Sequence, residues 1–311
     1  MAKKDPYILH SRGLQLDCRA PIPGGAHVMG ILNVTPDSFS DGGLYLEPAR
    51  ACEHAIQMVS DGARIIDVGG ASSRPKGAAY GEGAALISAR EELDRILPVI
   101  KLLSKELPST WISVDTFRSE VAKSALSEGA HMINDITALR FDSKIAEVAA
   151  SADAPMVLMH SVGLPGEMPH TRRPHTMRSH NGASESIVSN VVQELAVAAK
   201  QANDAGCCQI LLDPGFGFGK THEENLGLIE ETNTLVALGL PVLIGVSRKT
   251  TIGWLDGRDG TILPSLERLP GSLAVTAVAV LRGASIVRTH DVAETCRFLT
   301  AFKSTISINQ E

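Results

Sequence analysis

The residues best suited to chemistry stand in residues 210–220, ILLDPGFGFGK, where a carboxylate is followed by a glycine-rich turn. An apolar run typical of a buried strand leads to Asp213, and three glycines then alternate with phenylalanines. A carboxylate at a strand end, beside backbone without side chains, suits a flat ligand held close to the main chain. The spacing is one residue too short for a P-loop, and Lys220 stands where the dinucleotide-binding pattern requires glycine. For this stretch alone, a turn with a capping Asp is the simpler alternative.

Polar side chains also follow the other apolar runs of the chain, one after another. They are Asn33, the loop at residues 69–77, Asp115, Asn134 with Asp135, His160, Ser247 to Lys249, and Arg288 to His290. Each has a simpler explanation by itself: Asp115 suits the cap of a following helix, and a lone histidine suits the edge of a core. Independent caps have no reason to fall at strand after strand, so the set indicates one shared site.

The chemistry of that site follows partly from its donors and acceptors. A heterocycle with an N–C–N edge is suited by the carboxylates and amide of Asp115, Asn134 and Asp213. Phosphates are suited by the cationic and donor groups of Arg74, Lys249, Arg288 and His290. The carbonyl oxygen of Asn33 suits a magnesium ion carried by a diphosphate, whereas no spacing indicates a zinc site. A planar nitrogen ring with a diphosphate suggests transfer of an alkyl-type group, with pyrophosphate leaving.

The rest of the chain predicts the scaffold that positions these side chains. Short apolar runs, expected as strands, lie at residues 27–33, 64–68, 111–115, 131–136, 155–160, 209–213, 241–246 and 284–287. Helical patterns lie between or after them, at residues 48–60, 84–105, 119–127, 143–150, 184–205, 223–238, 267–281 and 292–302. Eight strand–helix units in a chain of this length predict an α/β fold, a single-domain (β/α)₈ barrel. The loops that leave the strands hold the polar residues, and in such a barrel those loops form the catalytic face.

Composition sets outer limits on the function. The 311 residues are 44% hydrophobic and 21% charged, an ordinary globular balance. A net charge of −6 argues against a nucleic acid or a membrane surface as partner. No signal segment or membrane span is apparent, and five cysteines without a CxxC spacing favour reduced thiols in the cytoplasm. We expect a leader at residues 1–25, the barrel at 26–305 and a tail at 306–311.

Eight segments, in order, resemble the dihydropteroate synthase family, the folate-pathway enzymes targeted by sulfonamides. They read MGILNVTPDSFSDGG, GARIIDVGGASSRP, ISVDT, INDI, LMH, LLDPGFGFGK, GVSRK and VRTHDV, and the match runs from about residue 28 to residue 301. The resemblance implies a (β/α)₈ fold and a homodimer. It also implies a transferase that condenses 6-hydroxymethyl-7,8-dihydropterin diphosphate with 4-aminobenzoate, giving 7,8-dihydropteroate and pyrophosphate with Mg²⁺ as cofactor.

The resemblance also implies a role for each matching residue. The pterin-recognition positions are Asp115, Asn134, Met159, Asp213, Phe218 and Lys249. Of these, the residues expected to take part in catalysis are Asp115, Asp213 and Lys249. The diphosphate positions are Asn33, Arg74, Arg288 and His290, with Asn33 as the metal ligand. The 4-aminobenzoate positions are Phe39, Ser73, Arg74, Pro75, Ser247 and Thr250.

The chain departs from the family pattern in its second loop, which usually reads GGESTRPG. Here Ala71 replaces the Glu, Ser73 the Thr and Lys76 the Gly, and a long basic segment follows at residues 161–186. Two alternatives stay open, the first of them because of this altered loop. One is a paralogue that binds a pterin without turning it over. The other is an enzyme like the methyltetrahydrofolate–corrinoid methyltransferases, which share the pterin-binding barrel but need no diphosphate clamp.

Overall fold

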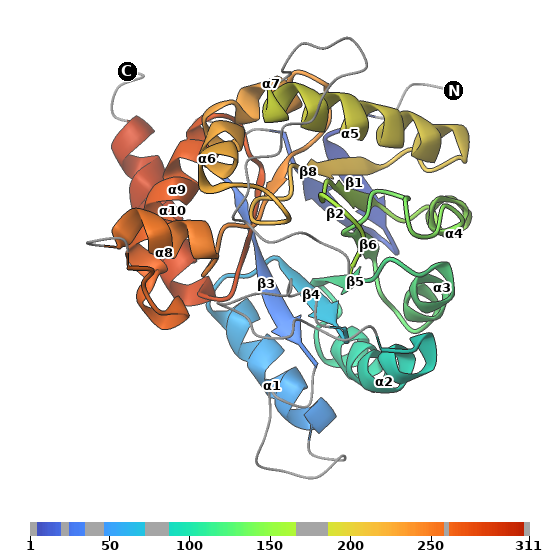
Figure 1. The fold of residues 1–311 in the computed structure, drawn as a ribbon. Helices are drawn as coiled ribbons and strands as arrows, with labels where there is room; N and C mark the ends of the chain where they lie inside the picture. Colours follow the sequence, from blue (N-terminus) through green and yellow to red (C-terminus); the bar gives the residue numbers. More distant parts are fainter. Residues whose placement is uncertain are drawn as a thin grey trace.

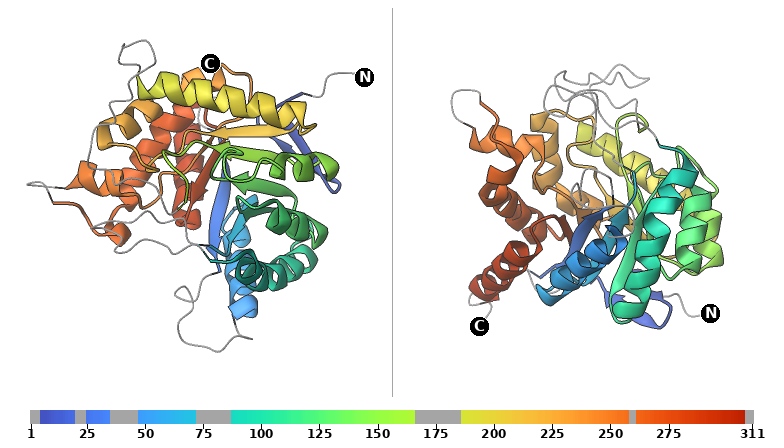
Figure 2. Two further views of the ribbon diagram at one scale, coloured as in Figure 1. Left: turned by 45° about the vertical axis from the view of Figure 1, so that its right-hand side comes forward. Right: turned by 90° about the horizontal axis from the view of Figure 1, so that it is seen from below.

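The computed structural model describes residues 5–19, 25–34, 47–71, 87–165, 186–257 and 261–307. Its main body is a ring of eight parallel strands, and helices lie outside the ring (Figure 1). Figure 2 shows the same arrangement from two further directions. Neighbouring strands follow the order β8-β7-β6-β5-β4-β3-β10-β9, and a parallel bridge from Leu212 to Val242 joins the last strand to the first. The predicted (β/α)₈ barrel is confirmed.

The elements alternate along the chain as the sequence indicates. The barrel strands are β3 (His27–Asn33), β4 (Ile65–Gly69), β5 (Trp111–Asp115), β6 (Met132–Asp135), β7 (Met156–Met159), β8 (Ile210–Asp213), β9 (Leu243–Ile244) and β10 (Ile286–Thr289). The helices are α1 (Glu47–Ser60), α2 (Ala89–Glu106), α3 (Ser119–Ser127), α4 (Ile145–Ser151), α5 (Ile187–Asp204), α6 (His222–Glu230), α7 (Thr232–Val236), α8 (Thr250–Asp256), α9 (Leu269–Leu281) and α10 (Val292–Ser307). A short 3₁₀ helix, η2, spans Ser265–Glu267. None of the helices in these described ranges is both long and apolar enough to cross a membrane.

Two helical regions differ from the sequence expectation. The helix expected at residues 223–238 is divided into α6 and α7, and the hydroxyl of Thr232 donates to the carbonyl oxygens of Leu228 and Ile229, each at 3.0 Å. A hydroxyl bonded back to the preceding turn competes with the regular helix pattern, and the helix changes course there. The short helix α8 was not expected. The extended backbone of Lys249 directly precedes it, so this lysine lies where a strand exit turns into a helix.

One side chain from each strand forms an apolar layer inside the lower end of the barrel, where the strands begin. The layer consists of Met29, Ile65, Trp111, Met132, Val157, Leu211, Leu243 and Ile286. Leu9, Leu16 and Cys18 pack in the same buried cluster. The two leucines belong to an antiparallel hairpin, β1 (Ile8–Ser11) and β2 (Leu14–Asp17), within the stretch where the sequence analysis expected only a leader. The hairpin therefore covers the lower end of the barrel.

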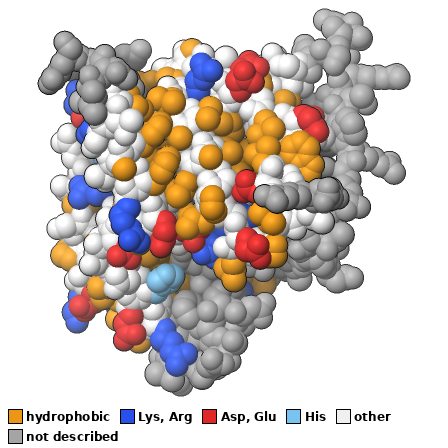
Figure 3. Space-filling view, turned by 90° about the vertical axis from the view of Figure 1, so that its left-hand side faces the viewer, with side chains coloured by type: hydrophobic (Ala, Val, Ile, Leu, Met, Phe, Trp, Pro, Cys, Tyr) orange, Lys and Arg blue, Asp and Glu red, His pale blue; other side chains and the backbone are white. Residues whose placement is uncertain are grey.

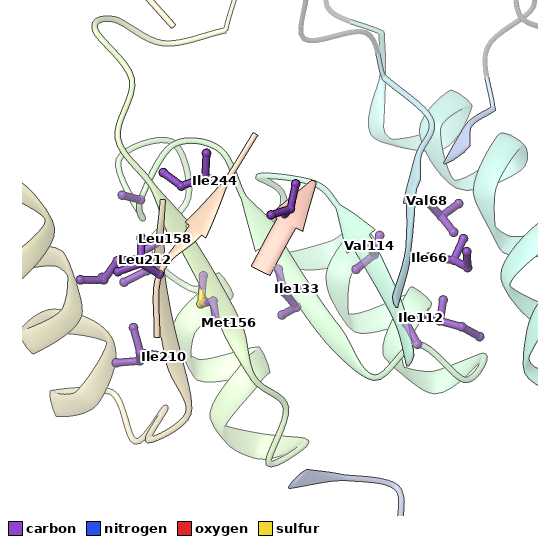
Figure 4. Close-up of a cluster of buried hydrophobic side chains, with 14 of the residues drawn as sticks. Ile66, Val68, Ile112, Val114, Ile133, Met156, Leu158, Ile210, Leu212 and Ile244 are labelled. Atoms are coloured by element: carbon purple, nitrogen blue, oxygen red, sulfur yellow. The ribbon is translucent and has the colours of Figure 1, made fainter. Parts of the chain in front are cut away.

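The alternate side chains of the same strands point outward, into the layer between strands and helices. Figure 4 shows part of that layer, with aliphatic side chains from neighbouring strands standing side by side; labelled examples are Ile66, Val68, Ile112, Val114 and Ile133. They are fully buried. Because strand side chains alternate between faces, this outward set leaves the residues between them to face the barrel interior. Above the apolar layer, many of those inward residues are polar.

Candidate functional site

The change from apolar to polar follows the pleat of the strands. On β4 the inward positions are Ile65, then Asp67, then Gly69, and on β5 Trp111 is followed at the same spacing by Ser113 and Asp115. The strand register places Asn33 beside Gly69 and Gly69 beside Asp115. The carboxyl ends of β3, β4 and β5 therefore meet at one level, where the sequence analysis expected the site.

Arg288 bridges two carboxylates at this level. Its Nε donates to Asp67 Oδ2 at 2.6 Å, and its Nη2 donates to Asp115 Oδ2 at 2.8 Å. Burial raises the pKa of Asp115 to about 7; the charge of Arg288 works against that rise and the nearby Asp67 adds to it. Arg288, which the sequence analysis assigned to the diphosphate, thus also balances the charge of Asp115, which it assigned to the ring. Sequence reasoning missed Asp67, because one polar residue inside an apolar strand did not stand out.

Asp213 and Lys249 influence each other's charge across the glycine-rich turn. Asp213 Oδ1 accepts a hydrogen bond from the backbone N–H of Gly215 at 2.7 Å. Burial raises the pKa of Asp213, and Lys249 opposes this. Lys249 donates to the carbonyl oxygen of Phe216, and its Nζ lies 4.3 Å from the centre of the Phe218 ring. Burial lowers the pKa of Lys249 to about 7, against the pull of Asp213.

Lys220 holds the glycine-rich turn from within. It is fully buried, and its Nζ donates to the carbonyl oxygens of Gly215 (2.8 Å), His160 (3.3 Å) and Phe218 (3.4 Å). Burial lowers the pKa of Lys220 to about 7. Gly215 has a positive φ of 67°, and a Cβ there would stand 1.7 Å from the oxygen of His160, so only glycine fits. The sequence analysis noted Lys220 only as a mismatch to a nucleotide motif and missed this contact set.

An apolar surface lies beside the charged groups. The predicted wall residues Met159 and Phe218 pack in one cluster with Phe117 and Ile136, which sequence reasoning did not name. Met159 is in register with Asp213 on the neighbouring strand. A flat ring held by Asp213 would therefore meet apolar side chains on its face and polar groups at its edge.

Ser247 and His290 are in direct contact, although the sequence analysis placed them with different ligands. Ser247 Oγ and His290 Nδ1 are 3.1 Å apart, and the backbone N–H of His290 donates to the same hydroxyl at 3.2 Å. Burial, with the nearby charge of Arg288, lowers the pKa of His290 to about 4, so its ring is neutral near pH 7. Between Ser247 and Lys249, Arg248 has a positive φ of 59° and pairs with Asp291.

Oxygen atoms suited to a cation lie on either side of Gly69. A Cβ at Gly69 would be 3.8 Å from Asn33 Oδ1 and 3.7 Å from Asp115 Oδ2. Among the described residues, no group of three or more His, Cys, Asp or Glu side chains is arranged to hold a metal ion. These residues therefore offer a hard cation one or two oxygens and no complete cage, which is how Mg²⁺ is usually held when phosphates supply the rest.

Most of the predicted site residues converge at the carboxyl ends of the strands. Thr250 is the first residue of α8, directly after Lys249. Four predicted residues lie outside the described part of the chain: Phe39, Ser73, Arg74 and Pro75.

A (β/α)₈ barrel whose carboxyl end gathers carboxylates, an amide and cationic side chains beside an apolar wall defines an enzyme scaffold for a polar, planar ring. The family described as pterin binding enzyme matches the chain over residues 29–290. The chain is 39% identical over 304 residues to the dihydropteroate synthase of Escherichia coli strain K12, covering 97% of this chain and 98% of that one. Two solved structures are dihydropteroate synthases from Xanthomonas albilineans. One holds 4-aminobenzoic acid (38% identity, TM-score 0.81) and the other 7,8-dihydropteroate (36%, TM-score 0.77); each comparison covers 96% of this chain and 98% of that one.

The chain belongs to the pterin binding enzyme family and, within it, to the dihydropteroate synthases. The resemblance drawn from the ordered sequence segments is confirmed.

Proposed function

We propose that the protein condenses 6-hydroxymethyl-7,8-dihydropterin diphosphate with 4-aminobenzoate, forming 7,8-dihydropteroate and pyrophosphate in folate biosynthesis. The observation that carries the proposal is the meeting of Asp115, Asn134 and Asp213 with Lys249 and Arg288 at one end of the barrel. That set joins acceptors for a ring rich in N–H groups to cations for a phosphate group.

The pterin ring is bound by the polar groups of β5, β6 and β8. Asp115 and Asp213 accept hydrogen bonds from ring N–H groups, as does the amide oxygen of Asn134, which is buried and has no partner in the part of the chain that the structure describes. Met159 and Phe218 cover a face of the ring, and Lys249 lies over Phe218 at the edge of the same apolar surface.

The diphosphate is bound by donors at the ends of β3 and β10. Arg288 and His290 supply N–H groups, and Arg74 is assigned to the same group from the family pattern. Mg²⁺ would be held by the side-chain oxygen of Asn33 together with phosphate oxygens and water. When bound, the ion supplies positive charge beside the departing phosphates.

The reaction is a displacement at the pterin methylene. The bond from the methylene carbon to the phosphate oxygen breaks, pyrophosphate departs with the electron pair, and the aryl amine attacks the carbon and loses a proton. Asp115 and Asp213 face the ring on which positive charge develops, while Arg288 and Lys249 lie where negative charge can be balanced. Stabilisation that strengthens as the charges separate is what lowers the barrier.

The second substrate is assigned to the far side of the same site. 4-Aminobenzoate is bound by Ser247 and Thr250, which flank Lys249, and by the loop residues Phe39, Ser73, Arg74 and Pro75. The bound 4-aminobenzoic acid in the Xanthomonas albilineans synthase, 38% identical to this chain, supports the assignment.

A turnover assay with both substrates tests the function against its two alternatives. The expected result is formation of dihydropteroate with one equivalent of pyrophosphate. Tight binding of the pterin diphosphate without product would instead identify a paralogue that only binds. Methyl transfer from methyltetrahydrofolate to a corrinoid, with no pyrophosphate formed, would identify the methyltransferase alternative.

We also propose that two copies of the chain form a homodimer through the surface of α8, η2 and α9. Helix α9 carries no charged residue, and a helix that is apolar all round is normally covered. Trp254, Leu255, Leu266 and Leu281 are exposed on this surface, Leu266 to 76%. Figure 3 shows the side of the molecule on which these helices lie, with hydrophobic side chains gathered in its middle. Replacing Leu281 by Glu should give monomers in sedimentation, and replacing the exposed Val197 on α5 by Glu should not.

The cytoplasm is the proposed location. The five cysteines form no disulfide, which suits a reducing compartment. The substrates are small molecules, and the net charge of −6 makes a nucleic acid or an anionic membrane surface an unfavourable partner.

A further inference from the structure

Asp67 makes two contacts that decide what the site presents to its substrate. The residue is fully buried on β4, one inward position below Gly69. Its Oδ2 accepts a hydrogen bond from Arg288 Nε at 2.6 Å and another from Asn134 Nδ2 at 3.0 Å. An oxygen that already accepts from a guanidinium, which can only donate, is an acceptor for its other neighbour as well. Asn134 must therefore turn its NH₂ group toward Asp67.

The consequence appears at the other end of the amide. Among the described residues Asn134 Oδ1 has no hydrogen-bond partner, although the residue is only 3% exposed. A buried acceptor without a partner is unfavourable, and a bound ligand that donates an N–H would relieve it. If the amide were rotated by 180°, its oxygen would face the oxygen of Asp67, and its NH₂ would face the substrate instead. Asp67 thus excludes the rotated amide.

We propose that Asp67 determines the ring specificity of the site by holding Asn134 with its amide oxygen toward the substrate. The inference rests on the proposed function and deepens it. The site selects a ring with an amino or N–H donor at that edge and rejects a ring with a carbonyl there. Asp67 acts through Asn134 as a positioning residue. A site built around a hydrogen bond to an N–H discriminates strongly because the wrong ring leaves a buried group unpaired.

A neighbouring residue supplies a matched control. Ser113 is in register with Asp67 on the next strand and is also fully buried, and its hydroxyl has no partner within the described ranges. It has no hydrogen bond to Asn134. Removing its hydroxyl changes the same layer of the barrel and leaves the orientation of the amide intact.

The test compares binding of pterin, which carries an amino group at position 2 of the ring, with its 2,4-dioxo analogue, which has a carbonyl there. Calorimetry on the full-length protein should show that the wild type prefers the amino ring. Asp67→Ala should reduce that preference at least about tenfold, the effect of one hydrogen bond. Asp67→Asn should keep most of it, since an amide oxygen can accept both contacts, and Ser113→Ala should keep it entirely. An unchanged preference in Asp67→Ala would overturn the proposal.

A double variant that exchanges the side chains of Asp67 and Asn134 keeps the test decisive if Asp67→Ala does not fold. Asn134→Asp brings two carboxylates into contact and should lose the amino ring. Because Asp67 Oδ2 makes both contacts in the wild type, adding Asp67→Asn restores a donor–acceptor contact in the opposite order once the new amide turns about its terminal bond. Its oxygen then accepts from Arg288, its NH₂ faces the new carboxylate, and a carboxylate oxygen faces the ring. The double variant should therefore recover at least about tenfold in affinity for pterin over Asn134→Asp. No recovery would overturn the proposal.

The wild type separates this inference from the function on which it rests. A wild-type protein that binds neither ring would overturn the proposed function and this inference with it. A wild type that discriminates between the rings, beside an Asp67→Ala variant that discriminates equally, would overturn the role of Asp67 alone.

Discussion

The two ends of the barrel are built from the same eight strands and have opposite chemistry. At the lower end, each strand contributes one apolar side chain to a closed layer, which the hairpin covers. One pleat higher, the inward positions on β4, β8 and β10 are Asp67, Asp213 and Arg288. Two residues along a strand cover about 7 Å. Over that distance the interior changes from a stabilising core to a charged site.

The comparison shows that one end of the barrel mainly provides stability and the other provides the site. Burying an apolar side chain of the lower layer stabilises the barrel by about 1.5–3 kcal/mol. Burying a charged group costs free energy unless a partner compensates it, and at the upper end the partners are other charged groups of the site. Substitutions at the lower end should therefore reduce stability without changing ligand preference, and those at the upper end should affect ligand binding first.

Substitutions of Arg288 and Ile286, neighbours on the inner face of β10, should differ most in their effect on the site. Arg288→Ala leaves Asp67 and Asp115 buried without their cation, so we expect a loss of about 3–5 kcal/mol in unfolding free energy together with loss of turnover. Ile286→Ala should cost about 2–5 kcal/mol and leave pterin affinity unchanged. Chemical denaturation and calorimetry on both variants measure the contrast. Full pterin affinity in Arg288→Ala would show that its ion pairs do not order the site.

Asp213 and Leu211 make the same comparison on β8. Asp213→Asn should weaken pterin binding about a hundredfold, because an acceptor-only group becomes an amide with one donor end facing the ring. The thermal midpoint should stay the same or rise, since burial already disfavours the charged form of Asp213. Leu211→Ala should lower the thermal midpoint and leave pterin binding unchanged. Equal pterin affinity in Asp213→Asn and the wild type would remove Asp213 from the site.

The parts of the molecule that follow from local pattern could be predicted from the sequence. The strand β3 and the helix α3 begin and end where the sequence analysis placed them, because apolar runs mark them and Gly129, with a positive φ of 118°, follows the end of α3. The residues at strand exits, such as Asp115 and Asp213, could be named because the carboxyl ends of parallel strands must meet at one face.

The parts that depend on contacts distant in the sequence could not be predicted. The hairpin of β1 and β2 is short and polar on one side, and it owes its place to the apolar layer that it covers. In the sequence Asp67 is one polar residue in an apolar strand. Only the structure shows that it pairs with Arg288, which lies 221 residues later. In the sequence Lys220 is one lysine after a glycine run, and only the folded structure places three carbonyl oxygens around its Nζ.

A substitution in the hairpin tests the lower end of the barrel alone. Leu9 is fully buried beneath the barrel, so Leu9→Ala should cost about 2–4 kcal/mol in unfolding free energy. Turnover per folded molecule and the KM for both substrates should not change, because the hairpin cluster consists of apolar side chains at the end of the barrel opposite the described site residues. Steady-state kinetics below the unfolding transition checks this. A shift in KM would mean that packing at the lower end is transmitted to the site.

The smallest expected effect per measured step is a change in the pH dependence of stability that comes from a buried lysine at the charged end. Burial lowers the pKa of Lys220 from 10.5 to about 7. Between pH 7 and 10.5 the unfolded chain therefore holds a proton at this lysine that the folded protein has released, and stability rises with pH in that window. Lys220→Met removes this contribution, so the slope of unfolding free energy against pH should fall by up to about 1.4 kcal/mol per pH unit.

Denaturation of wild type and Lys220→Met between pH 7 and 9.5 measures that slope. The comparison of slopes does not depend on the absolute stability of the variant. Lys200→Met is the matched control, because Lys200 on α5 has a side chain that is 74% exposed and pairs with the exposed Asp204. Its slope should equal that of the wild type. Equal slopes in all three proteins would mean that Lys220 stays protonated in the folded state. The three carbonyl oxygens would then hold a permanent cation, and the upper end of the barrel would be no more sensitive to pH here than the apolar end.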